Sequence, residues 1–194
     1  YNASGERIWS KEWGHGTNDV NDEVAKGIAI DSDDNIYITG YSMYSGLSGT
    51  AATNDIFVFK FNSLGEELWY KALGSEWSDK GNSIAVDSSN NVYVAAETQN
   101  SIDGNTYLGA RDAVLIKYNS NGVKQWTKQF GSYDNDFGYG VAIDSNDNIY
   151  VTGISDGEFD GKTDTGQSTD IFLIKFDSSG DKQWSQLKNS NSNY

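Results

Sequence analysis

The sequence predicts an all-β protein: a β-propeller segment made of four-stranded antiparallel blades. Two observations lead to this fold. A β-hairpin signal, in which two apolar runs flank a tight polar turn, occurs at 27–40, 83–96 and 140–153, so its copies begin 56 and 57 residues apart. No apolar period of 3.6 residues persists anywhere, which argues against helices. A four-stranded unit that repeats at this spacing is typical of a propeller blade.

Each repeat is expected to contain four strands, here named A to D in chain order. Strand A is predicted at 27–31, 83–87 and 140–144, and strand B at 35–40, 91–96 and 148–153. Strand C is predicted at 55–61, 112–118 and 170–176, and strand D at 66–73, 123–130 and 181–187, with an additional copy at 6–13. The A–B and C–D connections are short turns of Asn, Asp, Ser and Gly, as hairpins require. The B–C connection is long in every copy.

These strands define one domain over residues 1–194 with an incomplete first blade. Residues 1–13 are expected to end a preceding blade, three blades follow at 24–73, 81–130 and 138–187, and 188–194 form a connector. Three full blades and one outer strand do not close a ring of the usual four to eight blades. Because uncovered sheet edges are a liability, we expect the remainder of a larger propeller, or other copies of the chain, to complete the ring.

Three residue patterns favour a propeller over the remaining alternative, a long β-sandwich. Strand C is apolar on both faces, as in 56–59 and 171–174, which predicts burial between stacked blades. Strand A has a small central residue, which predicts crowding near the propeller axis. Strand D has one tryptophan, which predicts packing between blades. The small residues are Ala29, Ala85 and Ala142, and the tryptophans are Trp9, Trp69, Trp126 and Trp184.

The combined motif resembles a known repeat family. The pattern Ile-Ala-x-Asp-x-x-x-Asn-x-Tyr-Val-x-Gly, followed by Asp-x-Phe-x-x-Lys-x-x-x-x-Gly-x-x-x-Trp, resembles the SBBP-type bacterial and archaeal β-propeller repeat. Its strand-D part is also similar to the tryptophan-docking repeats of quinoprotein-like propellers. The resemblance covers nearly the whole chain and implies a propeller in secreted or cell-surface proteins, without catalytic residues. The copies depart from it at Ser83, Ala96 and Val114.

Composition limits the classes of partner. The formal net charge of −14 argues against binding of nucleic acid or of anionic membrane surfaces, both of which depend on Lys and Arg. No apolar run is long enough to insert into a membrane. The chain has no Cys, which excludes disulfides and thiolate metal sites. An acidic protein of this kind suits an extracellular, salt-containing medium or the cell surface.

The A–B turn of the first blade is the one candidate metal site. Asp31, Asp33 and Asn35 have the alternating oxygen spacing found at the start of calcium loops. The matching turns of the other blades keep fewer carboxylates, and an Asx-type hairpin turn explains the same residues. We therefore expect no cofactor, with calcium at Asp31, Asp33 and Asn35 as the minor alternative.

Catalytic motifs are absent. His15, the only histidine, stands in a connecting segment with no nucleophile motif around it. Paired carboxylates acting on glycans remain open in so acidic a chain, but they give no specific signal. We therefore expect a protein that is not an enzyme.

Binding residues are expected in the B–C loops, because these loops differ most between copies whereas the repeated parts form the scaffold. Aromatic side chains beside polar ones suit recognition of sugars or proteins, although they can equally cover the blade edge. The candidates are Tyr41, Tyr44, Tyr107, Arg111 and Phe159. The function expected is a non-enzymatic interaction or scaffold module of a secreted or cell-surface protein. The alternative is a carbohydrate-binding or adhesion module that uses these loops.

Overall fold

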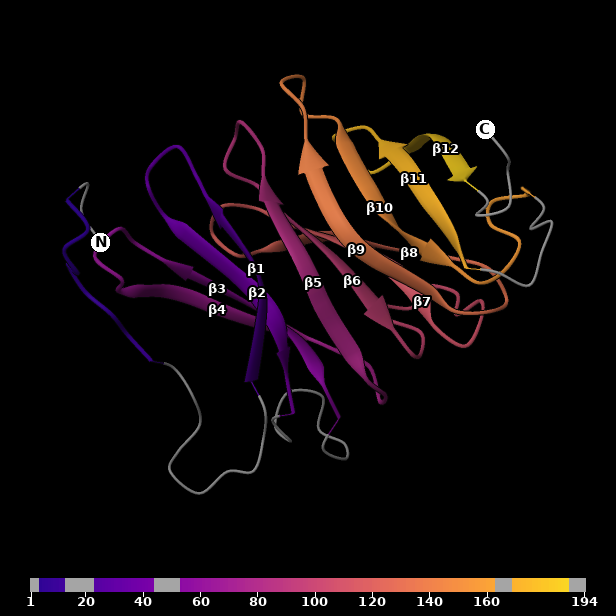
Figure 1. Cartoon of the computed structure of the whole chain (residues 1–194), viewed down its shortest axis with the longest axis horizontal. Helices are drawn as coiled ribbons and strands as arrows, with labels where there is room; N and C mark the ends of the chain where they lie inside the picture. The colour runs from indigo at the N-terminus through magenta and orange to yellow at the C-terminus, as the bar shows by residue number, and fades with distance from the viewer. Residues whose placement is uncertain (1–3, 13–22, 44–52, 163–168, 189–194) are drawn as a thin grey trace.

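The computed structural model describes residues 4–12, 23–43, 53–162 and 169–188, and all statements below refer to these residues. They form twelve strands in three separate four-stranded antiparallel sheets. The sheets lie one behind another along the length of the molecule (Figure 1). The described residues include no helix, and hence none that could cross a membrane. The predicted all-β propeller fold is confirmed.

Each sheet is one blade with its strands in chain order. Blade 1 consists of β1 (Glu23–Ile30), β2 (Ile36–Ser42), β3 (Asp55–Phe61) and β4 (Glu67–Leu73). Blade 2 consists of β5 (Asp79–Val86), β6 (Val92–Thr98), β7 (Asp112–Tyr118) and β8 (Lys124–Phe130). Blade 3 consists of β9 (Asp136–Ile143), β10 (Ile149–Ser155), β11 (Asp170–Phe176) and β12 (Lys182–Lys188).

The predicted boundaries are best for the C strands. The bounds of β3, β7 and β11 match the prediction at both ends. The A strands β1, β5 and β9 each begin four residues earlier than predicted. Their first halves interrupt apolar residues with polar residues or glycine, so no continuous apolar run identifies them, and they pair with the B strands through backbone hydrogen bonds.

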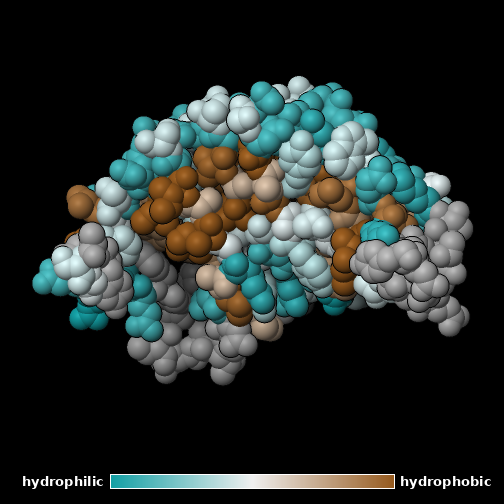
Figure 2. Space-filling model, turned by 45° about the horizontal axis from the view of Figure 1, so that its top comes forward, coloured by the Kyte–Doolittle hydropathy of each residue, from teal (hydrophilic) through white to brown (hydrophobic). Residues whose placement is uncertain are grey.

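The hydrophobic core lies between blades rather than within one. One cluster joins β2 and β3 of blade 1 to blade 2, through residues such as Tyr37, Val58 and Val94. A second joins blade 2 to blade 3, through residues such as Leu115, Val151 and Phe172. Blade 2 is therefore covered on both faces, which excludes a two-layer sandwich. A band of hydrophobic residues crosses the molecule between hydrophilic margins (Figure 2).

The C strands show what a covering blade contributes. In β7, which lies between two blades, side chains on both faces are buried, as predicted. β3 of the first blade is also largely buried on both faces, and its Phe57, Phe59 and Phe61 pack against one another. In β11, burial alternates, and Ile171 and Leu173 remain exposed on the face that no blade covers. At the other end of the segment, Ile28 and Ile30 of β1 are exposed for the same reason.

The outer-strand tryptophans dock on the next blade, as predicted. Nε1 of Trp69 donates a hydrogen bond to the carbonyl oxygen of Ser120 (3.1 Å). The indole lies against Gly122, where an added Cβ would come within 2.9 Å of the ring. Trp126 lies against Gly180 with the same 2.9 Å approach. Both glycines have a positive φ, of 73° and 82°, so glycine suits the turn for two separate reasons.

Residues 6–12 do not form a strand, contrary to the prediction of a strand at 6–13. A strand needs a hydrogen-bonded neighbour, and these residues have no sheet of their own to join. Trp9 nevertheless repeats the docking, because its Nε1 donates to the carbonyl oxygen of Ser63 (3.2 Å) and its ring lies against Gly65. This placement is consistent with the end of a preceding blade, which stays a prediction.

The closest packing of strand A is not at its central alanines, where it was expected. Ala85 is half-buried and Ala142 is exposed, so the central alanines are not the tightest positions. The close approach occurs at Gly81, where an added Cβ would lie 2.5 Å from Oγ1 of Thr39 and 2.8 Å from the carbonyl oxygen of Gly40. Neighbouring blades therefore meet most closely at glycine backbone in the first half of the strand.

Tryptophan docking can be tested with two matched substitutions. We expect Trp126→Ala to lower the free energy of unfolding by about 3–5 kcal/mol, because it removes a large side chain that packs against the interblade core. Trp184→Ala should cost less than about 1 kcal/mol, because Trp184 is 39% exposed and has no blade beyond it. Urea unfolding of both variants provides the measurement. Equal losses would contradict the docking role.

Candidate functional site

The blades present two different ends. The A–B and C–D turns lie at one end, here called the turn end, and the A–B turns project along the upper edge of the blades in Figure 1. The long B–C loops and the D–A connections lie at the opposite end, here called the loop end. The described parts of the loop end are 43, 53–54, 74–78, 99–111, 131–135, 156–162 and 169. The candidate metal site belongs to the turn end, and the described candidate ligand residues, Tyr41, Tyr107, Arg111 and Phe159, belong to the loop end or the strands leading to it.

The carboxylate of Asp31 is already surrounded by hydrogen-bond donors. Its oxygens accept bonds from the backbone N–H groups of Asp33 and Asn35, both at 2.9 Å, from Nδ2 of Asn35 and from the hydroxyl of Tyr37 (2.9 Å). Burial opposes the ionisation of Asp31, but these bonds hold the pKa of its carboxyl below the usual value. This arrangement is an Asx-type turn.

The same turn recurs in the other blades. Asp87 accepts from Asn91 and Tyr93, and Asp144 accepts from Asn148 and Tyr150. The hydrogen bonds from Asn148 are the main cause of the lowered pKa of Asp144, about 2. In each A–B turn, the residue just before the asparagine has a positive φ, and the asparagine itself donates hydrogen bonds. The residues with positive φ in these turns are Asp34, Asn90 and Asp147.

Neighbouring A–B turns are also joined to each other. Oδ2 of Asp33 accepts from Nδ2 of Asn90 (2.9 Å). In the next pair, Asp147 accepts from the backbone N–H (3.0 Å) and the hydroxyl (2.7 Å) of Ser88. Asp31, Asp33 and Asn35 are thus engaged in bonds within and between turns, which supports their structural interpretation over a calcium site.

The candidate ligand residues do not form one site. The ring of Tyr41 in β2 lies near the ammonium groups of Lys26 and Lys80, at 5.9 and 5.0 Å from the ring centroid. Tyr107 is exposed, and its hydroxyl donates to the carbonyl oxygen of Ala110 (2.8 Å). Tyr44, like His15, lies outside the described residues.

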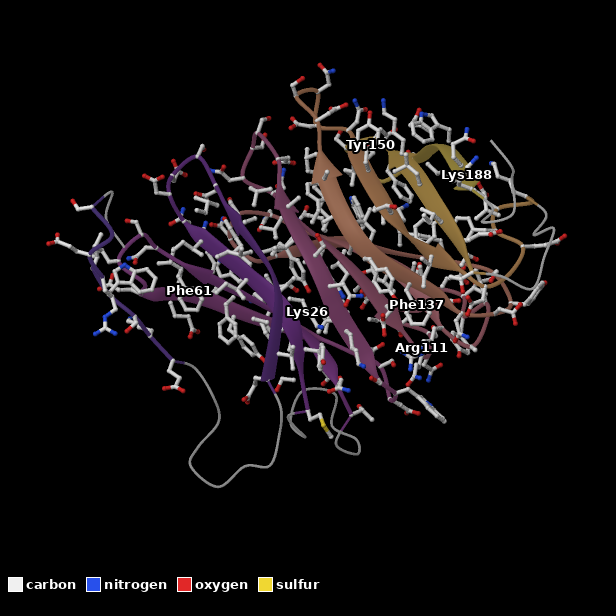
Figure 3. The ribbon with its side chains drawn as sticks, viewed as in Figure 1. Lys26, Phe61, Arg111, Phe137, Tyr150 and Lys188 are labelled. Carbon is white, nitrogen blue, oxygen red and sulfur yellow. The ribbon has the colours of Figure 1, made fainter. Side chains whose placement is uncertain are left out.

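Arg111 is held at the junction of blades 2 and 3. Its Nη1 forms an ion pair with Oε1 of the buried Glu97 (2.8 Å), and its guanidinium carbon lies 5.4 Å from the ring centroid of Phe137. Figure 3 shows Arg111 and Phe137 next to each other near the lower ends of their strands. This pairing fixes Arg111 between two blades, so only part of its charge faces solvent.

Phe159, a candidate ligand residue, is buried in the interblade core. It is 2% exposed and stacks on Phe172, with ring centroids 4.7 Å apart. Ile102 takes the corresponding place between blades 1 and 2. After each of these residues comes an Asp with positive φ, Asp103 or Asp160, that pairs with a lysine of strand D. The B–C loops therefore insert one apolar side chain into each interblade core.

The sequence interpretation missed two exposed aromatic side chains at the loop end. Trp77 is 59% exposed and Tyr133 is 88% exposed, and each belongs to a D–A connection. Ala110 donates its backbone N–H to the carbonyl oxygen of Asp134 (3.1 Å), so the loop that carries Tyr107 lies beside Tyr133. The signal available in the sequence was that these connections also differ between copies.

The sequence interpretation also missed a set of buried carboxylates. The first residues of strands C and A supply them, and they meet in pairs where adjacent blades join: Asp55 with Asp79, and Asp112 with Asp136. All four are at most 1% exposed. In each, Oδ1 is buried without a hydrogen-bond partner. Asp79 and Asp136 each stand eight residues before the aspartate of the next A–B turn, and this repetition could have identified them.

Burial and mutual repulsion disfavour ionisation of these pairs. Burial, together with the charge of Asp79, raises the pKa of Asp55 to about 6. Burial also raises the pKa of Asp136, although hydrogen bonds from Ser132 oppose the effect. The described residues include no group of three or more His, Cys, Asp or Glu side chains arranged to hold a metal ion.

The sequence matches one family model and two named relatives. The model described as "Beta-propeller repeat" (SBBP) matches residues 8–42, 69–103 and 125–160. The chain is 26% identical over 167 residues to the "Regulatory protein FlaEY" of Caulobacter vibrioides, covering 79% of this chain and 17% of that protein. It is 29% identical over 139 residues to an uncharacterized WD repeat-containing protein of Acanthamoeba polyphaga mimivirus, covering 60% of this chain and 9% of that protein. It thus spans less than a fifth of either relative.

Solved structures give only distant likenesses. A mutant of the Synechocystis apocarotenoid oxygenase aligns with a TM-score of 0.46 and 16% identity, over 84% of this chain and 38% of that one. A Bacteroides caccae protein of unknown function aligns with a TM-score of 0.43 and 11% identity, over 86% of this chain and 61% of that one.

The raised pKa of Asp55 predicts a pH dependence of stability. Stability from this group is fully present below pH 4, where the carboxyl is protonated in both states, and is lost as the pH rises through about 6. Asp55→Asn removes the titration. We expect the difference in the free energy of unfolding between the Asp55→Asn variant and the unsubstituted chain to increase between pH 4 and 7, by up to about 3 kcal/mol in favour of the variant. Urea unfolding in chelator-containing buffer measures the difference; a constant difference would show that Asp55 is not perturbed.

Proposed function

Because this chain belongs to the SBBP beta-propeller repeat family, we propose that it acts as a non-enzymatic module for protein interaction within a larger propeller. The repeated features, namely the Asx-type turns, the docked tryptophans and the interblade cores, serve the scaffold. Propeller folds host many functions, so the argument for function depends on surface residues rather than on the fold. The names of the two relatives, a regulatory protein and a WD repeat-containing protein, agree with an interaction role.

The observation that carries this proposal is the exposure of Trp77 and Tyr133 at the loop end. Both stand in D–A connections, one at each blade junction, and the loop that carries Tyr107 is hydrogen-bonded to the connection that carries Tyr133. Large aromatic side chains contribute most of the binding energy in many protein interfaces because they bury much surface with few rotatable bonds. Neither side chain contributes to the interblade cores, so their size is not explained by folding.

The charge around these aromatic residues favours a basic partner. Glu76, Asp134 and Glu158 are exposed at the loop end, and the chain carries a net charge of −14. Complementary charge steers association and favours arginine-rich surfaces, whose guanidinium groups also stack on aromatic rings. We therefore propose a protein segment rich in arginine as the ligand of the loop end.

A glycan ligand is the second candidate. Tyr107 and Tyr133 lie among Asn, Asp and Ser side chains, and such mixed surfaces also suit sugar rings. For either ligand we propose an extracellular or cell-surface location. The supporting observations are the family resemblance and the acidic charge of the chain. Proteolysis of intact cells, followed by detection of the chain, would test the location.

Binding can be measured with defined probes. We expect a fluorescent peptide of alternating Arg and Gly to bind the chain, and binding to weaken as salt rises. Trp77→Ala and Tyr133→Ala should each lower the affinity about fivefold or more, corresponding to ~1 kcal/mol. Trp184→Ala is the matched control, because Trp184 is an exposed tryptophan in an outer strand, away from the loop end.

Two outcomes would contradict the proposed partner. One is equal binding of a matched Glu–Gly peptide. The other is equal affinity for the Arg–Gly peptide in all three variants, which would mean that attraction is not localised at the loop end. Binding of neutral oligosaccharides that depends on Tyr133 would instead support the glycan alternative.

A further inference from the structure

In three of the four buried carboxylates between blades, hydrogen bonds hold one oxygen, and in all four Oδ1 has no hydrogen-bond partner. Oδ2 of Asp79 accepts from the backbone N–H (2.5 Å) and the hydroxyl (2.9 Å) of Ser75. Oδ2 of Asp136 accepts from the same two groups of Ser132, at 2.6 and 2.9 Å. The other oxygen of each carboxylate, Oδ1, is buried without a partner. The donors hold each carboxylate in one orientation. The hydroxyls of Thr98 and Ser155 also lie close to Asp79 and Asp136 and oppose the rise in the pKa of each carboxyl.

Of the two opposite members, Asp112 also has one bonded and one unpartnered oxygen. Oδ2 of Asp112 accepts from the backbone N–H of Leu108 (2.8 Å) and from Nε2 of Gln129 (2.7 Å), while its Oδ1 is buried and unpartnered. Oδ1 of Asp55 is also buried and unpartnered. Hydrogen bonds to a carboxylate favour its charged form, yet two buried carboxylates without a counter-charge are costly.

A glycine keeps the space beside each pair open. An added Cβ at Gly131 would lie 2.5 Å from Oδ2 of Asp136 and 3.1 Å from Oδ1 of Asp112. Both carboxylates therefore border the same small volume. At the first junction, an added Cβ at Gly74 would lie 2.0 Å from Oδ1 of Asp55. A side chain at either position would therefore collide with a carboxylate oxygen, so only glycine fits beside these carboxylates as they are oriented.

A buried hydroxyl at the first junction also lacks a hydrogen-bond partner. Ser42 pairs directly with Asp55 across β2 and β3, and its Oγ is buried without a hydrogen-bond partner. A buried hydroxyl normally finds a partner, so an unpartnered one directly opposite Asp55 calls for an explanation. Oxygen atoms of carboxylates and hydroxyls are the groups that hard cations use as ligands.

We propose that each blade junction binds one hard divalent cation, Ca²⁺ in the first instance, between Asp55 and Asp79 and between Asp112 and Asp136. The open Oδ1 atoms are the charged ligands, and Ser42 is an additional ligand at the first junction. Each site has only two carboxylates, so neutral oxygens of hydroxyl groups, backbone or water complete the coordination. The ion neutralises two buried charges and joins strand C of one blade to strand A of the next.

Calcium titrations of the 194-residue chain test this proposal. After chelator treatment, isothermal titration with CaCl₂ should give two sites per chain from these junctions. At 100 times the dissociation constant for one site, the unfolding equilibrium constant should fall about 100-fold, measured as a rise in melting temperature. Asp79→Asn and Asp136→Asn should each remove one site. Asp33→Asn, an exposed carboxylate of the A–B turn, is the matched control and should leave both sites in place.

The proposal is overturned if CaCl₂ in the millimolar range gives neither binding heat nor a rise in melting temperature. It is also overturned if Asp33→Asn abolishes the response, because the ion would then occupy the A–B turn. Crystals of the unsubstituted chain grown with CaCl₂ keep the test decisive if the variants do not fold. They should show an ion about 2.3–2.6 Å from Oδ1 of Asp79 and Oδ1 of Asp55, and an ion elsewhere would refute the assignment.

Discussion

The contact between blades is the constraint on which the rest of this structure depends. A single four-stranded sheet buries little on its own, and here both hydrophobic clusters lie between sheets. Trp69 and Trp126 extend these clusters to the outer edge, where each indole needs a glycine turn of the next blade. The tryptophan and its glycine partner therefore form one contact shared by two blades, and the packing of either residue is explained only by the neighbouring blade.

The stretches matched by the family model also extend from one blade into the next. Each matched stretch begins at or beside the strand D tryptophan and continues through strands A and B of the next blade. The repeated unit of sequence thus spans a junction, so features of the junction recur with it. Asp79 and Asp136 recur in this way, together with Ser75 and Ser132. Loop residues outside the contact, such as Trp77 and Tyr133, are free to differ between copies.

The sequence predicted the parts of the fold that repeat as apolar patterns. The C strands were predicted to the residue because their apolar runs end sharply. The polar first halves of the A strands were missed, because backbone pairing leaves no apolar signal. Among the candidate site residues, Arg111 is tied to Glu97, and Phe159 is buried. Local sequence could not show this, because the partners Phe172 and Phe137 come from strands that only the fold brings near.

The buried carboxylates show how electrostatics and packing are linked at a junction. Apolar residues in place of Asp112 and Asp136 would avoid the cost of burying charge. Without these carboxylates, a side chain at position 131 would not meet their oxygens. Hydrogen-bond donors orient both carboxylates, and both border one small volume beside Gly131, through Oδ2 of Asp136 and Oδ1 of Asp112. The buried carboxylates, their hydrogen-bond donors and Gly131 therefore have a joint explanation if a cation is bound, whereas without one the buried charges only destabilise the junction. A counter-charge in that volume would make blade association depend on solution conditions, whereas the tryptophan docking, being largely apolar, would not.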